Sequence, residues 1–165
     1  MKNAILALVS LFSVATVHAG LKAGDSLTPY EIKNVSNGKE YCQVCAYGAK
    51  AGKIVAFGKL NDEAFWSDLK QLQKLQNDFK DLGVFAQVID SSDTAAIKAT
   101  ASKHGITFPV VVAVSKDWDK AYKVNGVSRT IYYAQRNNKI VWTSVGLPEN
   151  SFAQLQEKVK TDVKG

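Results

Sequence analysis

His104–Gly146 reads HGITFPVVVAVSKDWDKAYKVNGVSRTIYYAQRNNKIVWTSVG, and this stretch decides the fold. Its apolar run Phe108–Val114 predicts a buried strand, and Trp118–Val124 predicts a short helix. Two more strand-like runs, Arg129–Tyr133 and Ile140–Val145, flank an Arg-Asn-Asn-Lys turn. Turn residues between two such runs predict an antiparallel hairpin.

Upstream of this stretch, strands and helices alternate. Lys53–Phe57 and Val84–Ile89 are apolar runs suited to buried strands. Between them we expect a long helix that begins after Asn61 as N-cap and stops near Gly83. The apolar residues of this helix recur at helical spacing: Phe65, Leu69, Leu72, Leu75 and Phe79.

Three further elements complete the predicted fold. Leu27–Val35 has strand character, Thr94–His104 predicts a helix that ends at Gly105, and Phe152–Val159 carries the apolar face of a last helix. An early strand–helix–strand unit followed by a late antiparallel hairpin is typical of a mixed sheet flanked by helices. We therefore predict an α/β fold with an N-terminal strand extension.

Residues 1–19 have the pattern of a secretory signal peptide. Lys2 precedes an apolar run from Ala4 to Val17, and small residues allow cleavage after Ala19. The run is shorter than the roughly 20 residues that cross a bilayer. We expect a periplasmic or secreted protein with no membrane span, in which residues 20–165 form a single domain.

The charge pattern says little about partners. The formal net charge is +6, and it becomes +5 when the signal segment is removed with Lys2. Because the lysines are spread along the chain, they predict a solvated basic surface rather than a binding patch. A nucleic-acid partner is not expected for an exported protein of this kind, and the sequence predicts no oligomeric state.

Cys42 and Cys45 are the two cysteines of the chain, in the stretch EYCQVCAYG. A structural zinc site needs four ligands, and His104 is the one histidine outside the signal segment. Haem attachment needs a histidine at position 46, where alanine stands. We therefore expect no metal and no cofactor at this pair.

A disulfide between Cys42 and Cys45 has a conformational requirement. Residues three apart in a strand are separated by about 10 Å, whereas a disulfide needs Cα atoms within about 7 Å. A bonded pair therefore predicts a turn or one turn of helix, with Tyr41, Val44 and Tyr47 on its packed side. A four-residue loop stabilises a fold by only about 2 kcal/mol, so a redox role and a local structural role both remain open.

The stretch His104–Gly146 resembles the redoxin group of the thioredoxin-like superfamily, which includes TlpA-like thioredoxins and peroxiredoxins. The residues that carry the resemblance are Phe108, Pro109, Ala121, Tyr122, Val124, Gly126, Val127, Thr130, Ile140, Val141 and Gly146. The resemblance implies a thioredoxin-like fold over nearly the whole mature chain. It also implies a redox cysteine at the start of the first long helix, facing a cis-proline.

The sequence departs from that pattern at both functional positions. Gly58–Asp62 leads into the long helix without a cysteine, and Ser128 stands where thiol reductases keep the cis-proline. Pro109 matches the ordinary proline at a strand start and is expected to be trans. Without a thiol to activate, Arg129 is expected on the surface or on an edge strand. A standard peroxidase is therefore disfavoured.

Two hypotheses of function follow. In the first, Cys42 and Cys45 exchange disulfides with a protein partner or sense redox state; by analogy Cys42 attacks first, and Lys39 or Lys50 lowers its pKa. In the second, the fold is a non-catalytic binding module with a local structural disulfide. An exposed pair beside a hydrophobic groove favours exchange, and a buried pair far from any groove favours the binding module.

Overall fold

The computed structural model describes residues 20–124 and 126–163. The predicted signal peptide, residues 1–19, lies outside the described residues. The strands are β1 (Glu31–Asn34), β2 (Glu40–Cys42), β3 (Gly52–Gly58), β4 (Leu82–Val88), β5 (Val110–Ala113), β6 (Thr130–Gln135) and β7 (Ile140–Val145). The helices are α1 (Gln43–Ala46), α2 (Glu63–Asp78), α3 (Thr94–Lys103), α4 (Trp118–Tyr122) and α5 (Glu149–Asp162).

The strands form one mixed sheet in the order β2-β1-β5-β4-β3-β6-β7. β3, β4 and β5 run parallel, as expected for strands joined through α2 and α3. β6 and β7 form the predicted antiparallel hairpin beside β3. At the other edge, β1 and β2 confirm the predicted N-terminal extension. The predicted α/β class is therefore confirmed.

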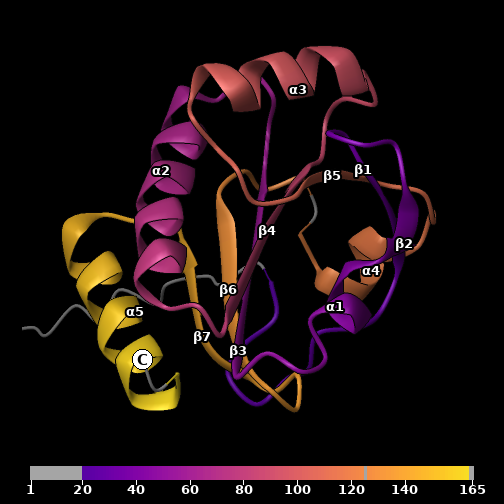
Figure 1. The fold of residues 1–165 in the computed structure, drawn as a ribbon. Helices are drawn as coiled ribbons and strands as arrows, with labels where there is room; N and C mark the ends of the chain where they lie inside the picture. Colours follow the sequence, from indigo (N-terminus) through magenta and orange to yellow (C-terminus); the bar gives the residue numbers. More distant parts are fainter. Residues whose placement is uncertain (1–19, 125, 164–165) are drawn as a thin grey trace, which may run out of the picture.

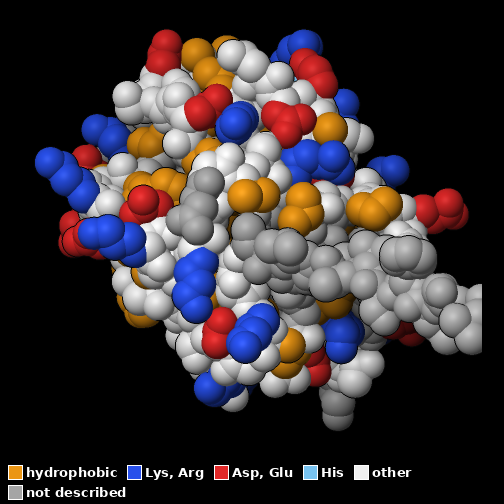
Figure 2. All heavy atoms as spheres, turned by 180° about the vertical axis from the view of Figure 1, so that it is seen from behind, with side chains coloured by type: hydrophobic (Ala, Val, Ile, Leu, Met, Phe, Trp, Pro, Cys, Tyr) orange, Lys and Arg blue, Asp and Glu red, His pale blue; other side chains and the backbone are white. Residues whose placement is uncertain are grey.

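Helices cover both faces of the sheet (Figure 1). α2, α3 and α5 lie on one face, where Phe65, Leu72 and Leu155 belong to one apolar core. α1 and α4 lie on the other face, where Val44 and Tyr122 belong to a second core. β3 is buried at all seven of its positions because it lies between these two cores. On the face seen in Figure 2, acidic and basic side chains are interspersed, as the spread of lysines predicts.

The structure corrects both predicted ends of the long helix. The N-cap is Asp62 rather than Asn61, and its carboxylate accepts the backbone N–H groups of Ala64 and Phe65. The helix ends at Asp78, and Gly83 lies inside β4. Gly83 is small for a packing reason, because a Cβ there would lie 2.5 Å from the Tyr47 ring.

The segment before β1 is tied to the hairpin at the far edge of the sheet. The Gly24 N–H donates to the Ile140 carbonyl, and the Leu27 N–H donates to the Asn138 carbonyl, each at 2.9 Å. The Leu21 N–H donates to the Tyr132 hydroxyl at 3.0 Å. This segment therefore closes the second core. None of the helices in the described part of the chain has the length and apolar character that crossing a bilayer requires.

Buried tyrosines make the fold sensitive to alkaline pH. Burial raises the pKa of Tyr122, Tyr132 and Tyr133 above the ordinary value of about 10. The unfolded chain loses these protons at lower pH than the folded chain, so stability falls as the pH rises above about 10. We expect the phenolate absorbance of these residues to rise in one step together with the loss of far-UV circular dichroism. Gradual ionisation within the folded protein would contradict this burial.

Candidate functional site

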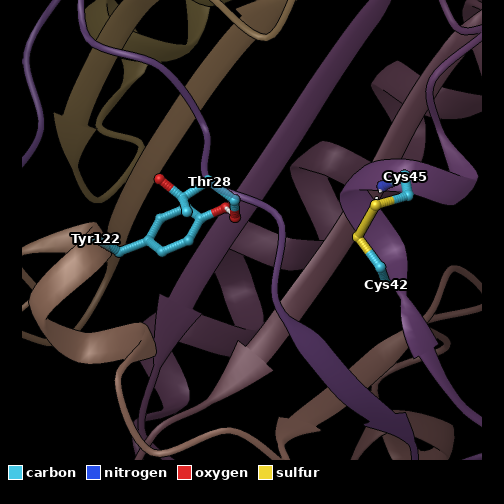
Figure 3. Close-up of a disulfide and its surroundings, with 4 residues drawn as sticks. All are labelled: Thr28, Cys42, Cys45 and Tyr122. Carbon is cyan, nitrogen blue, oxygen red and sulfur yellow. Dashed lines mark hydrogen bonds between the residues drawn. A yellow bond between two sulfur atoms is a disulfide. The ribbon is translucent and has the colours of Figure 1, made fainter.

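Cys42 and Cys45 form a disulfide at the point where β2 passes into α1 (Figure 3). The S–S distance is 2.18 Å and the Cα atoms are 5.2 Å apart. Cys42 is the last residue of β2, and Cys45 lies in the single helical turn that follows. The prediction that a bonded pair requires a turn of helix is confirmed.

The two sulfurs have different surroundings. Cys42 is half-buried and is the N-cap of α1, where its Sγ accepts the backbone N–H of Cys45 at 3.1 Å. Cys45 is exposed. A hydrogen bond from an N–H is stronger to a thiolate than to a neutral sulfur, so this contact stabilises Cys42 as a thiolate. Cys45, the second cysteine, is thus the more exposed residue of the pair. The analogy with other C-x-x-C proteins instead places the first cysteine at the surface.

Side chains on both sides of the pair fix the short helix α1 to the sheet. Val44 is buried in the second core, and the Tyr41 hydroxyl donates to the Gln43 side chain at 2.6 Å. The Tyr47 hydroxyl donates to the Val84 carbonyl at 3.0 Å, and its ring covers Gly83. Tyr41, Val44 and Tyr47 therefore pack against the fold as predicted. These contacts hold the disulfide-bearing turn against the sheet.

The charges around the pair differ from the expectation. Lys50 donates through Nζ to the Lys80 carbonyl at 2.8 Å, and Lys39 is exposed. The residue paired with Cys42 across the strands is Glu31. A carboxylate beside a thiol opposes thiolate formation. The N–H of Cys45 is therefore the favourable contact that the structure gives to the Cys42 sulfur.

A groove of about 360 Å³ lies next to the disulfide-bearing strand. Its walls are Thr28, Pro29, Tyr30, Glu31, Ser115, Asp117, Trp118 and Ala121. Glu31 is at once a wall of this groove and the cross-strand partner of Cys42. The disulfide is thus partly exposed; neither cysteine lines this mainly apolar groove, and Glu31 is the residue that links the two.

The start of α2, where the redoxin pattern has its cysteine, carries a hydrogen-bonded polar pair. Ser128 donates through Oγ to the Asp62 carboxylate at 2.7 Å. This hydrogen bond and those from the Phe65 and Ala64 N–H groups outweigh desolvation and lower the Asp62 pKa. Ser128, which the resemblance places at the cis-proline position of thiol reductases, therefore does lie against the start of α2. No peptide bond among the described residues is cis, Pro109 included.

The expectation that Arg129 is a surface or edge-strand arginine holds only in part: its side chain is 33% exposed, but it precedes the inner strand β6 and pairs with a buried carboxylate. Its Nε donates to Asp68 Oδ2 at 2.8 Å and its Nη2 donates to Oδ1 at 3.2 Å. Asp68 is only 3% exposed and also accepts the Leu147 N–H at 3.2 Å. The reason is local geometry, because Arg129 has φ +67° before β6 begins and so turns inward. Gly146 leaves the space, since a Cβ there would lie 2.4 Å from Nη2 of Arg129.

Asp68 is the site residue that the sequence analysis missed. A signal was present, because Asp68 falls three residues after Phe65 and four before Leu72, on the apolar face of the predicted helix. A carboxylate in such a position needs a buried partner. Sequence alone does not show that the partner is Arg129, sixty-one residues away.

His104 is the C-cap of α3, as the predicted end of this helix at Gly105 implies. Its ring stacks on Trp66, with the centroids 5.5 Å apart. Among the described residues, no three His, Cys, Asp or Glu side chains lie close enough together to hold a metal ion.

Comparison with known proteins places the fold. No family model and no curated protein matches the sequence. The thioredoxin domain of a thiol-disulfide oxidoreductase from Bacteroides vulgatus matches with a TM-score of 0.71 and 16% identity, over 84% of this chain and 99% of that one. A thiol:disulfide interchange protein from Bacteroides sp. matches with a TM-score of 0.69 and 18% identity, over 88% and 92%.

An uncharacterized thioredoxin-like protein from Porphyromonas gingivalis matches with a TM-score of 0.62 and 25% identity, over 84% of this chain and 92% of that one. Two of these three structures are described as a thiol-disulfide oxidoreductase domain and a thiol:disulfide interchange protein, and the third as thioredoxin-like. The fold of this chain is therefore thioredoxin-like, as the resemblance to the redoxin group implies.

Removal of the Arg129 side chain tests the ion pair at α2. We expect Arg129→Ala to lower the free energy of unfolding by about 3 kcal/mol, because it leaves the buried Asp68 carboxylate without its cation. The matched control is Arg136→Ala, which removes an exposed arginine 3.7 Å from Asp81. An exposed pair contributes below about 1 kcal/mol. Equal losses in urea unfolding of the two variants would contradict this assignment.

Proposed function

We propose that this protein is an exported thiol–disulfide exchange protein whose redox pair is Cys42–Cys45 in α1. The observation that carries the proposal is the placement of the disulfide: Cys45 is exposed, Cys42 caps the helix, and the cross-strand partner of Cys42, Glu31, lines an apolar groove. An oxidising compartment keeps such a pair bonded. Residues 1–19 supply the export signal, and residues 20–165 act as the single mature domain.

The exchange step follows from the two environments. A thiolate of a partner protein attacks the exposed Cys45 Sγ, the Cys42–Cys45 bond breaks, and Cys42 leaves as a thiolate that accepts the Cys45 N–H. A second thiolate of the partner then attacks the partner's own sulfur in the mixed disulfide and releases Cys45. The partner becomes a disulfide, this protein takes up two electrons as a dithiol, and solvent supplies protons to its thiolates.

Exposure supports Cys45 as the residue that forms the mixed disulfide. The analogy with other C-x-x-C proteins assigns this role to Cys42, which here is half-buried and held by the N–H of Cys45. Cys42 is better suited to be the leaving group, because a stabilised thiolate leaves faster. The partner is a protein with a pair of thiols or a disulfide.

A second candidate is a binding module without redox chemistry. The observation in its favour is the tip of α2, where Asp62 and Ser128 occupy the positions of a thiol and a cis-proline. In that case Cys42–Cys45 is a local staple, and the fold recognises a partner without exchanging electrons.

The reduction potential of the pair separates the two candidates. Equilibration of the purified protein with glutathione of defined poise, followed by quantification of free thiols, gives the value. A potential between about −270 and −120 mV supports exchange. A potential below about −300 mV is typical of structural disulfides, and it would reject exchange in favour of the binding module.

Single variants assign the roles of the two cysteines. In Cys42→Ser the exposed Cys45 thiol remains. The partner is ribonuclease that has been treated with oxidised glutathione. We expect Cys45 to form a mixed disulfide with this partner that stays trapped. In Cys45→Ser we expect about tenfold less trapped complex, because the remaining sulfur is half-buried. Cys42→Ser/Cys45→Ser is the control without thiols. More complex from Cys45→Ser than from Cys42→Ser on non-reducing gels would reverse the assignment.

A further inference from the structure

We propose that the α4 face of the sheet binds an extended, basic polypeptide segment, and that Gln87 donates a hydrogen bond to a backbone carbonyl of that segment. The inference rests on the proposed function and deepens it, because it names the class of substrate. It is carried by a hollow, an unsatisfied buried donor and a one-sided distribution of charge.

Two hollows meet at Trp118. One is the groove of about 360 Å³ beside β1, which contains Tyr30 and Glu31. The other, of about 290 Å³, lies at the carboxyl end of β4 and is lined by Gln87, Val88, Ile89, Asp90, Ser91, Ser92, Val112, Ala113 and Trp118. Trp118 lines both and stacks on Phe57, with ring centroids 5.7 Å apart. The two hollows together offer a path on either side of one fixed aromatic ring.

Gln87 provides a hydrogen-bond donor that an occupant of this path could satisfy. The residue is fully buried in β4, and its Oε1 accepts the Tyr30 hydroxyl at 2.5 Å. Its Nε2 is buried and has no hydrogen-bond partner among the described residues, and Gln87 is one of the residues that line the second hollow. A buried donor without an acceptor is costly, and native structures hold few of them. An occupant with a carbonyl oxygen at this point satisfies the amide, and a polypeptide backbone presents such oxygens at regular spacing.

The charges along the path select the side chains of the occupant. The protein has a net charge of +6, yet the charged residues described in the two hollows are all acidic: Glu31, Asp90 and Asp117. Asp117 faces Lys120 at 3.5 Å in an exposed pair, which neutralises little. Asp90 uses one oxygen to accept the Leu60 N–H. Carboxylates beside the half-buried rings of Tyr30 and Trp118 favour lysine or arginine and disfavour an anionic occupant.

The path leads toward the redox pair. The Tyr122 hydroxyl holds the Thr28 carbonyl at 2.7 Å, and the chain runs on from Thr28 into β1, next to β2 and the disulfide (Figure 3). Glu31, at the end of the path, is the cross-strand partner of Cys42. A bound segment is therefore presented to the disulfide from the groove side.

The experiment measures peptide binding without redox chemistry. The protein is Cys42→Ser/Cys45→Ser, and the probes are acetyl-Phe-Lys-Phe-Lys-amide and its counterpart with glutamate in place of lysine. Trp66 and Trp142 are buried, so a change in tryptophan fluorescence reports Trp118; calorimetry gives the affinity. We expect the lysine peptide to bind at least tenfold more tightly than the glutamate peptide, on the order expected for complementary against repelling charges.

Variants place the peptide in the path. Gln87→Met keeps the volume and removes the donor, and we expect about tenfold weaker binding. Asp117→Asn, at the exposed rim, is expected to weaken binding of the lysine peptide about threefold. This variant provides the test if Gln87→Met does not fold. The matched control is Asp119→Asn on the same helix, outside both hollows, with unchanged binding. Equal binding of the two peptides, or an effect of Asp119→Asn as large as that of Asp117→Asn, would overturn the inference.

The outcome is separate from that of the proposed function. If the two peptides bind equally and the reduction potential lies in the exchange range, only the proposal of peptide binding in the groove is overturned. Selective peptide binding with a potential below about −300 mV would support the groove and reject exchange, so that the binding module becomes the function.

Discussion

The functional account depends on one geometric constraint: a disulfide between residues three apart cannot form in a strand. The chain meets it by leaving β2 at Cys42 and making one turn of helix, which brings the Cα atoms of Cys42 and Cys45 to 5.2 Å. The same turn aims the Cys45 N–H at the Cys42 sulfur and leaves Cys45 exposed. Tyr47 and Val44 hold the turn against the sheet. Local geometry thus produces the chemical difference between the two sulfurs.

The tip of α2 carries polar side chains and no thiol. In this thioredoxin-like fold Asp62 at the start of α2 accepts the Ser128 hydroxyl, and six residues further on the buried Asp68 pairs with Arg129. A carboxylate held by a hydroxyl and two N–H groups supplies no thiolate and forms no covalent link to a partner. The polar network instead ties the segments before β6 and after β7 to α2, because Asp68 also accepts the Leu147 N–H. Figure 1 shows α1 and the start of α2 on opposite faces of the sheet.

Sequence alone predicted the class of fold and most of its elements, although not the strand β2, because apolar periodicity and turn residues are local signals. It also predicted the helical turn at Cys42, since that follows from covalent geometry. It did not predict the Arg129–Asp68 ion pair or the unsatisfied amide of Gln87, because both depend on which side chains meet across the fold. Nor did it place the N-cap at Asp62, whose carboxylate accepts two backbone N–H groups of α2 and the Ser128 hydroxyl. Exposure of Cys45 and half-burial of Cys42 likewise arise from packing around α1.

The central claim is that the sulfur chemistry of this thioredoxin-like fold belongs to α1 and not to the tip of α2. The most direct test is a comparison of backbone amide NMR shifts in the oxidised and the reduced protein. The account predicts that reduction moves the amide signals of residues 40–48 and of the groove residues beside β1, while those of Asp62 and Ser128 stay in place. Large shifts at Asp62 and Ser128, with residues 40–48 unchanged, would contradict it.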